Sequence, residues 1–273
     1  MPPEKQAERG RRPRRAPQHH GRRPSGPRNF RDSSALNQVE VIKHEIGSEL
    51  KLKFLPLGGC GEVTRSCYVY EYKDDIVIVD MGLQFPDEDM PGIDYIIPNV
   101  DYLRPKKKNI RGVIITHGHY DHMGAIPHLI EALGSPVFYT MPLTRGMILK
   151  RQEDFKSMPK PVIEAVDENS KLKLGQFEVE FVHVNHNIPD SMGVILKTPA
   201  GTVFHTGDWK FDHTPVNEKP ADMNRLKEIG NAGVMLMVSD STGAKDAGRT
   251  MSETEIQKNL DESDFEVVER KGI

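Results

Sequence analysis

The sequence predicts an α+β layered fold that carries a divalent-metal site. Short β-rich segments separated by Gly, Pro and Asp follow one another from about Ser48, and only a few segments have helical spacing. Three histidines and an aspartate lie between His117 and His122, directly after an apolar segment. Together these features indicate a protein that mixes strands with fewer helices and holds a metal beside a strand end.

The length and composition are those of a globular protein. At 273 residues, 37% of them hydrophobic, the chain is long enough to form a substantial core. It has no run of eighteen apolar residues, and its arginine-rich start lacks the apolar segment of a secretory signal, so we expect a cytoplasmic protein without a membrane partner. Cys60 and Cys67 flank a Gly-rich turn, and we interpret them as free thiols.

The N-terminus is strongly basic although the formal net charge of the chain is −3. Residues 1–32 contain ten Lys or Arg and three acidic residues, set among Pro, Gly and His. Such a segment has little to bury, so we predict a disordered arm over residues 1–47. A cationic arm binds phosphates by releasing counterions, which predicts salt-sensitive contact with RNA; the alternative is a solubilising tail.

We predict one structured domain over residues 48–250. Its expected strands are Leu52–Leu55, Cys67–Tyr72, Ile76–Val79, Val113–Thr116, Val137–Tyr139, Leu172–Val184, Gly193–Thr198, Thr202–His205 and Val234–Ser239. Its expected helices are Met123–Leu133, Met141–Lys150 and Ala221–Ile229. The hairpin-like succession of strands favours a layered α+β arrangement over a regular parallel sheet.

The C-terminal segment, residues 251–273, begins like a helix and ends in a charged stretch. Ser252 is a candidate N-cap, and Glu255 would complete a capping box for a helix over Ser252–Leu260. We interpret the segment either as a frayed tail or as the start of a further region that is cut short.

The strongest chemical signal is the segment from Thr116 to His122, with the sequence THGHYDH. A strand end and the turn after it direct alternate imidazoles and a carboxylate toward one point, and Gly118 lets the backbone turn closely. Imidazole nitrogen and carboxylate oxygen are the donors that zinc and similar divalent ions take. A solvated polar loop would have to produce this cluster by chance.

Two further candidate ligands, His186 and Asp208, have the same placement directly after a β-like segment. If all converge, His117, His119 and His186 form one site, while Asp121 and His122 begin a second. Asp208 offers two oxygens and is able to bridge them. Two ions side by side favour hydrolysis by displacement at phosphorus.

Three other residues have more than one interpretation. Asp80 ends the strand Ile76–Val79 and is either a turn former or a residue that holds a ligand histidine in the right tautomer. We expect His183 and His205, which lie in β-like segments, to be packed or exposed rather than metal ligands.

The succession of Asp80, the HxHxDH segment, His186 and Asp208 resembles the motifs of the metallo-β-lactamase superfamily. The surrounding segments narrow the resemblance to its β-CASP ribonucleases of the ribonuclease J family: Leu57–Glu62 (LGGCGE), Gly124–Pro127 (GAIP), Ile188–Ser191 (IPDS) and Ser239–Thr242 (SDST). One position departs from the pattern, because Tyr120 stands where the family often has Glu.

The resemblance implies a partial αββα sandwich, with two zinc or manganese ions at one edge, that cleaves RNA internally and from a 5′ end. Its metal ligands would be His117, His119, Asp121, His122, His186 and Asp208. The implied catalytic residues are Asp121, His122, Asp208 and Asp80, of which Asp80 supports the site from behind. In the family a β-CASP domain and a last ligand histidine follow this region, so we expect the chain to be truncated before them.

Two alternatives remain at this stage. One is a metallo-hydrolase of small esters or thioesters, and the other is a catalytically incomplete RNA-binding remnant. Besides RNA, the expected partners are a second copy of the chain or a separately encoded second half.

Overall fold

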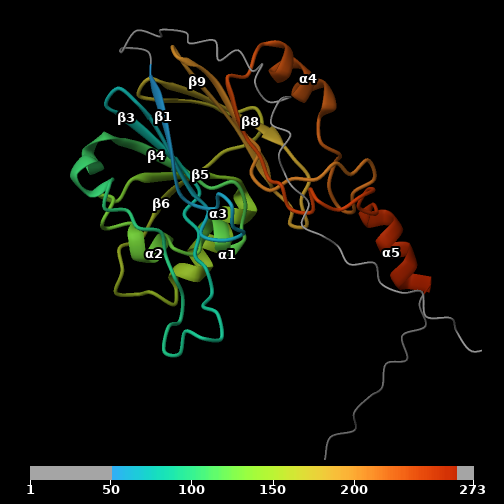
Figure 1. Ribbon diagram of the computed structural model, residues 1–273, viewed down its shortest axis with the longest axis horizontal. Helices are drawn as coiled ribbons and strands as arrows, with labels where there is room; N and C mark the ends of the chain where they lie inside the picture. Colours follow the sequence, from blue (N-terminus) through green and yellow to red (C-terminus); the bar gives the residue numbers. More distant parts are fainter. Residues whose placement is uncertain (1–50, 263–273) are drawn as a thin grey trace, which may run out of the picture. The chain divides into compact units, whose positions relative to one another are not determined.

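Two β-sheets form the centre of the fold, with helices on their outer sides, in the computed structural model, which describes residues 51–262 (Figure 1). The first sheet has the order β1-β2-β3-β4-β5-β6, with β1 Leu52–Gly58, β2 Cys67–Tyr72, β3 Asp75–Val79, β4 Ile110–Ile114, β5 Val137–Thr140 and β6 Val162–Ala165. The second has the order β11-β10-β9-β8-β7, with β7 Lys171–Leu174, β8 Phe177–His183, β9 Met192–Thr198, β10 Gly201–His205 and β11 Leu236–Val238. The predicted arm over residues 1–47 lies outside the described residues.

Strand direction changes within the first sheet. The β1–β2 and β2–β3 pairs are antiparallel, whereas β3–β4, β4–β5 and β5–β6 are parallel. The predicted hairpin succession is therefore wrong for β4 to β6. Parallel neighbours need long crossovers, and the segments before β4 and β5 supply them with the 3₁₀ helix η2 (Arg104–Asn109) and two short α-helices.

Three apolar clusters separate the layers and confirm the αββα sandwich. The one between the sheets joins residues such as Tyr70 and Val77 of the first sheet to Phe181 and Leu196 of the second. A second cluster covers the outer face of the first sheet, where the helices near β4 and β5 pack. The third places Ile229 of α4 (Met223–Asn231) against the outer face of the second sheet.

The helix predicted over Met123–Leu133 is wrong in its extent. The structure has two single-turn helices instead, α1 Tyr120–Met123 and α2 Ile126–Leu129. The first ends at Gly124, and Pro127 lies at the start of the second, where proline is tolerated because the first helical N–H groups need no partner. α1 therefore begins inside the metal motif and fixes the direction of Asp121 and His122.

The remaining helices lie close to their predicted ranges. α3 runs over Pro142–Gln152, α4 over Met223–Asn231 and α5 over Glu253–Glu262. Among residues 51–262, no helix is both long and apolar enough to cross a lipid bilayer.

Two strand predictions need correction. The segment Leu172–Val184 is a hairpin of β7 and β8 rather than one strand, and Gly175 turns the chain with φ of +60°. The strand β6 was not predicted, because its Val-Ile-Glu-Ala sequence is short and mostly exposed at the sheet edge.

Candidate metal centre

All six predicted ligands lie just beyond strand ends, where the two sheets come together. They are His117, His119, Asp121 and His122 after β4, His186 after β8, and Asp208 after β10. The structure brings all six together, since each has a side-chain nitrogen or oxygen within 3.7 Å of another member. The second sheet thus completes a cluster that begins in the first.

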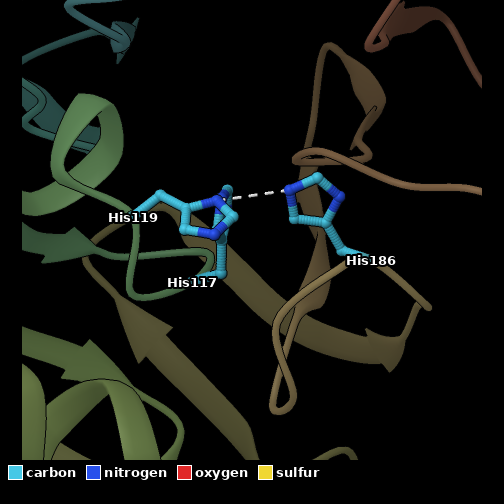
Figure 2. Close-up of side chains that lie close together, drawn as sticks. All are labelled: His117, His119 and His186. Carbon is cyan, nitrogen blue, oxygen red and sulfur yellow. Dashed lines mark hydrogen bonds between the residues drawn. The ribbon is translucent and has the colours of Figure 1, made fainter. Parts of the chain in front are cut away.

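Three imidazoles form what we call the imidazole group: His117, His119 and His186 (Figure 2). The Nδ1 atom of His119 lies 3.0 Å from Nε2 of His117 and 3.3 Å from Nε2 of His186. Ligand nitrogens that surround a tetrahedral zinc ion at about 2.0–2.1 Å stand about 3.3–3.4 Å from one another. The His119 nitrogen thus lies from its two neighbours at about this spacing, and all three ligand nitrogens lie within 4.8 Å of one another, close enough to share a divalent ion.

The buried carboxylate of Asp80 orients two of the histidines. It accepts hydrogen bonds from the backbone N–H of Thr116 (2.8 Å), from the Thr116 hydroxyl (2.9 Å) and from Nδ1–H of His122 (2.8 Å). Because the Thr116 hydroxyl donates to Asp80, its oxygen is left to accept from Nδ1–H of His117, 3.0 Å away. With Nδ1 engaged in this way, both histidines turn Nε2 toward the cluster, which leaves that nitrogen as the atom that would ligate a metal.

Asp80 adopts a left-handed backbone conformation, with φ of +63°, which Asp tolerates better than most residues. The chain after it runs against the metal motif, with Met81 N–H donating to the carbonyl of His122 at 2.7 Å. A Cβ at Gly82 would stand 1.5 Å from the carbonyl oxygen of Asp121. Only glycine permits this approach, which holds the motif against Asp80.

A second set of ligands, which we call the carboxylate group, comprises Asp121, His122 and Asp208. Nε2 of His122 lies 3.4 Å from Oδ2 of Asp121 and 3.4 Å from Oδ1 of Asp208. The other oxygen of Asp208, Oδ2, lies 3.7 Å from Nε2 of His186. Asp208 therefore faces both groups, one oxygen toward each.

Burial sets the protonation of the imidazole group. Desolvation, followed by the neighbouring His122, lowers the pKa of His117 far below its ordinary value. Desolvation also lowers the pKa values of His119 and His186, although nearby carboxylates oppose it. The lowered pKa values favour the neutral form of all three imidazoles, which is the form that binds metals.

The carboxylate group behaves in the opposite way. Burial alone would lower the pKa of His122, but Asp80 and the hydrogen-bonded Asp121 and Asp208 raise it well above the ordinary value. Burial alone would raise the pKa of Asp208, but His122 and the other imidazoles lower it. Three carboxylates therefore face one imidazole, and this surplus of negative charge favours a cation.

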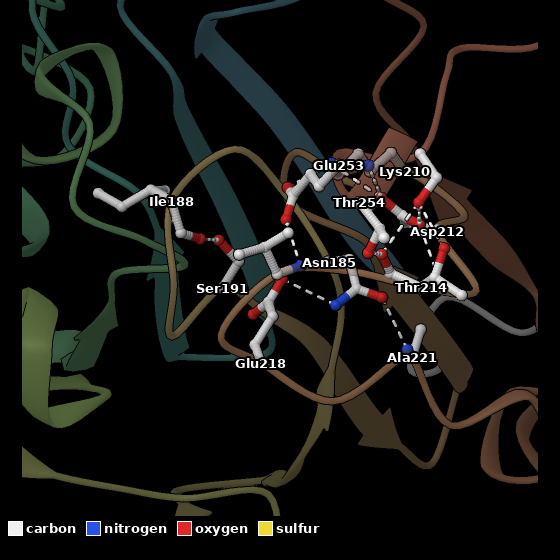
Figure 3. Close-up of polar contacts among 12 residues, drawn as sticks. Asn185, Ile188, Ser191, Lys210, Asp212, Thr214, Glu218, Ala221, Glu253 and Thr254 are labelled. Carbon is white, nitrogen blue, oxygen red and sulfur yellow. Dashed lines mark hydrogen bonds and ion pairs between the residues drawn. The ribbon is translucent and has the colours of Figure 1, made fainter. Parts of the chain in front are cut away.

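A buried amide holds the segment that carries His186 (Figure 3). The side chain of Asn185 donates to Oε1 of Glu218 and to the carbonyl of Lys219, both at 2.8 Å, and accepts from the N–H of Ala221 at 2.7 Å. The backbone carbonyl of Asn185 accepts a hydrogen bond from the backbone N–H of Lys210 at 2.8 Å. Asn185 thereby joins the segment after β8 to the segment that follows Asp208.

The same region anchors helix α5 (Figure 3). Asp212 accepts from the N–H of Glu253 at 2.9 Å and from the Ser252 hydroxyl at 2.8 Å, so a residue outside the helix caps its first turn. The Glu253 carboxylate pairs with Lys210 and accepts from the N–H of Val216 at 2.9 Å. The capping box predicted from Ser252 and Glu255 did not anticipate this long-range contact.

A cleft of about 620 Å³ opens on the carboxylate group. Asp121, His122 and Asp208 line it, together with the turn around Gly59–Thr64 and the polar segment Ser239–Thr242. Its walls come from segments far apart in the sequence, and their hydroxyl and backbone groups suit a polar, extended substrate.

The two remaining strand histidines, His183 and His205, are buried. Nε2 of His183 lies 2.9 Å from the carbonyl oxygen of Lys219. His205 lines the cleft, and its Nδ1 lies 2.9 Å from the Tyr70 hydroxyl. Burial lowers the pKa of His205 to about 4. Within residues 51–262, neither histidine belongs to a group with the spacing of metal ligands.

Sequence reasoning overlooked the residues that support the ligands. Thr116 was visible as the residue before the histidine motif, and Asn185 as the residue before His186. What the sequence lacked was their partners, because Asp80 lies 36 residues from Thr116 and Glu218 lies 33 residues from Asn185.

Comparison with known proteins agrees with this arrangement. The profile of the metallo-beta-lactamase superfamily matches residues 60–244. Ribonuclease J of Helicobacter pylori (strain ATCC 700392 / 26695) is 40% identical over 234 residues, covering 83% of this chain and 34% of that protein. Ribonuclease J of Thermus thermophilus is 38% identical over 221 residues, covering 79% of this chain and 39% of that protein. The chain thus spans about a third of the length of the curated relatives that it matches.

A solved structure supports the fold. The crystal structure of a protein of unknown function from Enterococcus faecalis V583 has a TM-score of 0.57 and 17% identity, covering 77% of this chain and 56% of that one. The profile match spans the candidate ligands and more than half of the sequence. The chain therefore belongs to the metallo-β-lactamase superfamily.

Proposed function

We propose that this chain is the metal-binding part of a ribonuclease J-like enzyme that hydrolyses RNA phosphodiester bonds with two divalent ions. The observation that carries the proposal is the position of Asp208, whose two oxygens face the imidazole group and the carboxylate group at 3.7 and 3.4 Å. A carboxylate between two donor sets is the arrangement of two-metal hydrolases.

In this proposal His117, His119 and His186 would hold one ion, Asp121 and His122 would hold the other, and Asp208 would serve both. The donor set of imidazoles and carboxylates favours zinc, with manganese as the alternative. Such ions acidify bound water and neutralise charge on a phosphodiester. Asp80 does not touch the substrate; it is a positioning residue that keeps His117 and His122 in the ligating tautomer.

The proposal of RNA as substrate rests on the similarity to ribonuclease J and on the open cleft beside the carboxylate group. Ser239, Ser241, Thr242 and Lys245 line that cleft with hydroxyl and cationic groups that suit phosphates, while Asp240 and Glu62 add carboxylates to it. The proposed activity comprises 5′-3′ exonuclease and endonuclease cleavage in cytoplasmic RNA processing and decay. Pairing with a second copy or with a complementing chain remains a prediction.

Incubation with a 5′-monophosphorylated RNA and zinc or manganese tests this function. We expect cleavage by the wild-type chain and a loss of at least about 100-fold in an Asp121→Ala, His122→Ala double variant, because ligand removal abolishes the second ion site. The matched control is an Asp89→Ala, His213→Ala double variant, since both residues are exposed and outside the cluster.

The same experiment separates the alternatives. Hydrolysis of a small thioester without cleavage of RNA would replace the nuclease with a small-substrate hydrolase. Salt-sensitive RNA binding without any hydrolysis, at full metal loading, would indicate a catalytically incomplete remnant.

A further inference from the structure

A second cavity, of about 390 Å³, has His119 among its lining residues. Tyr120, Met123 and Met147 line it, and His119 itself forms part of its wall. One candidate ligand, His119, thus lines this cavity, while Asp121, His122 and Asp208 line the larger cleft. The cavity therefore borders the candidate metal centre through His119.

An aromatic side chain in the lining of this second cavity is partly exposed and is held in place by its neighbours. Tyr120 is 43% exposed, and the Arg151 guanidinium lies over its ring at 4.6 Å. Arg151 also lies over Phe155 at 4.9 Å, while the ring of Phe85, itself 61% exposed, approaches Tyr120 edge-on at 6.4 Å. These contacts fix the Tyr120 ring although it is not part of the core.

The charges around the cavity cancel. Lys150 and Arg151 stand against Glu153 and Asp154, and Lys150 pairs with Glu153 at 2.6 Å. A phosphate would therefore gain little binding free energy in this cavity. A flat, neutral group would bind better, because it stacks on the tyrosine ring and packs against the flexible methionine side chains.

We propose that this cavity, lined by Tyr120, Met123 and Met147, binds a nucleobase of the nucleotide next to the phosphodiester bond at the metal cluster. The inference rests on the proposed nuclease function and adds a base-binding site to it. Aromatic rings and arginine guanidinium planes are the surfaces on which single-stranded RNA bases stack. Carboxylates at the rim, Glu153 and Asp154, accept hydrogen bonds from the amino groups of bases.

Methyl NMR detects occupation of the cavity directly. The chain is labelled at its methionine methyl groups, and Met123 and Met147 are assigned with Met→Leu variants. Adenosine 5′-monophosphate and ribose 5-phosphate are then titrated separately; they share a phosphate and ribose but only the first has a base. We expect the nucleotide to shift the Met147 methyl signal and to bind more tightly by roughly 5- to 150-fold, the range for one stacked base.

Variants at the cavity test the role of the ring. Tyr120→Ala should remove the preference for the nucleotide over ribose 5-phosphate, and Tyr120→Phe should retain it. Leu149→Ala is the matched control and should behave as wild type, because Leu149 lies on helix α3 with Met147 but is exposed and does not line the cavity. Equal shifts of Met147 with both probes, or a preference that survives Tyr120→Ala, would overturn the proposal.

Hydrolysis of bis(p-nitrophenyl) phosphate, which has no nucleobase, tests the metal centre separately. A base-specific shift of the Met147 signal without metal-dependent hydrolysis would support the base-binding site and contradict the proposed nuclease function. Hydrolysis without a base-specific shift of the Met147 signal would support the proposed nuclease function and contradict the base-binding site.

Discussion

The two halves of the candidate metal centre contain the same residue type in opposite electrostatic states. In the imidazole group, burial lowers the pKa values of all three histidines. In the carboxylate group, His122 is also buried, yet Asp80, Asp121 and Asp208 raise its pKa. The carboxylates hydrogen-bonded to His122 therefore outweigh its burial, whereas burial prevails at the three imidazoles of the other group.

One residue links the two halves. Asp80 accepts from His122 directly and from His117 through the Thr116 hydroxyl. The two groups should therefore respond together to a change at Asp80 and separately to changes at their other supports.

Asp80→Ala should have the strongest effect of the substitutions considered. It leaves the Thr116 N–H and hydroxyl and the His122 Nδ1–H without their buried acceptor. We expect metal affinity at both groups to fall by about 10- to 100-fold and the free energy of unfolding to fall by about 3 kcal/mol. Metal titration followed by calorimetry and urea unfolding of the metal-free chain measure these two quantities.

Thr116→Val is the matched control, because it breaks only the path to His117. It should weaken the imidazole group alone. If Asp80→Ala weakened one group and spared the other, the linking role of Asp80 would be wrong.

An intermediate effect concerns His205, which is buried near the same carboxylates but has a pKa lowered to about 4 from the ordinary 6.5. Between these two values the unfolded chain binds a proton that the folded chain does not. The contribution of neutral His205 to the free energy of unfolding is therefore complete above pH 6.5. It is lost as the pH falls toward 4, by up to about 3 kcal/mol.

Urea unfolding of the metal-free chain at pH 7 and pH 4.5 measures this loss. His205→Gln keeps a hydrogen-bond partner for Tyr70 but does not titrate, so its stability should fall less over the same interval. Parallel pH dependences for the variant and the wild type would show that the carboxylates, rather than burial, control His205.

A weaker effect is expected for Asn185→Ala, which frees the segment carrying His186 from Glu218, Lys219 and Ala221. Metal affinity at the imidazole group should fall about 10-fold, since supports of ligand residues typically contribute that much. Ser191→Ala, which removes one hydrogen bond to Ile188 in the same segment, should have a smaller effect. Equal weakening of both groups, measured by calorimetric metal titration, would contradict the assignment.

The sequence allowed a layered α+β fold and the six ligand candidates to be predicted because strand ends and metal donors are local features, whereas the αββα sandwich was implied by the family resemblance. The motif from His117 to His122 follows an apolar strand, and His186 and Asp208 repeat that placement. Two short helices replaced one predicted helix because Gly124 and Pro127 act as local breaks whose effect depends on packing against β-strands.

Other features depend on contacts between distant segments. The role of Asp80 remained open in the sequence, because a turn former and a tautomer-fixing carboxylate look alike until Thr116 and His122 lie beside it. The parallel pairing of β4 to β6 and the exposure of Tyr120 beside Arg151 likewise arise only in the folded chain.

Counting divalent ions per chain by native mass spectrometry distinguishes two ion sites from one. The wild-type chain should bind two zinc ions, and His119→Ala and His122→Ala should each lose one and retain the other, because each substitution removes a ligand from a different group. A wild-type chain with a single ion that both variants lose would be incompatible with the proposed centre, since the cluster would then be one shared site rather than two.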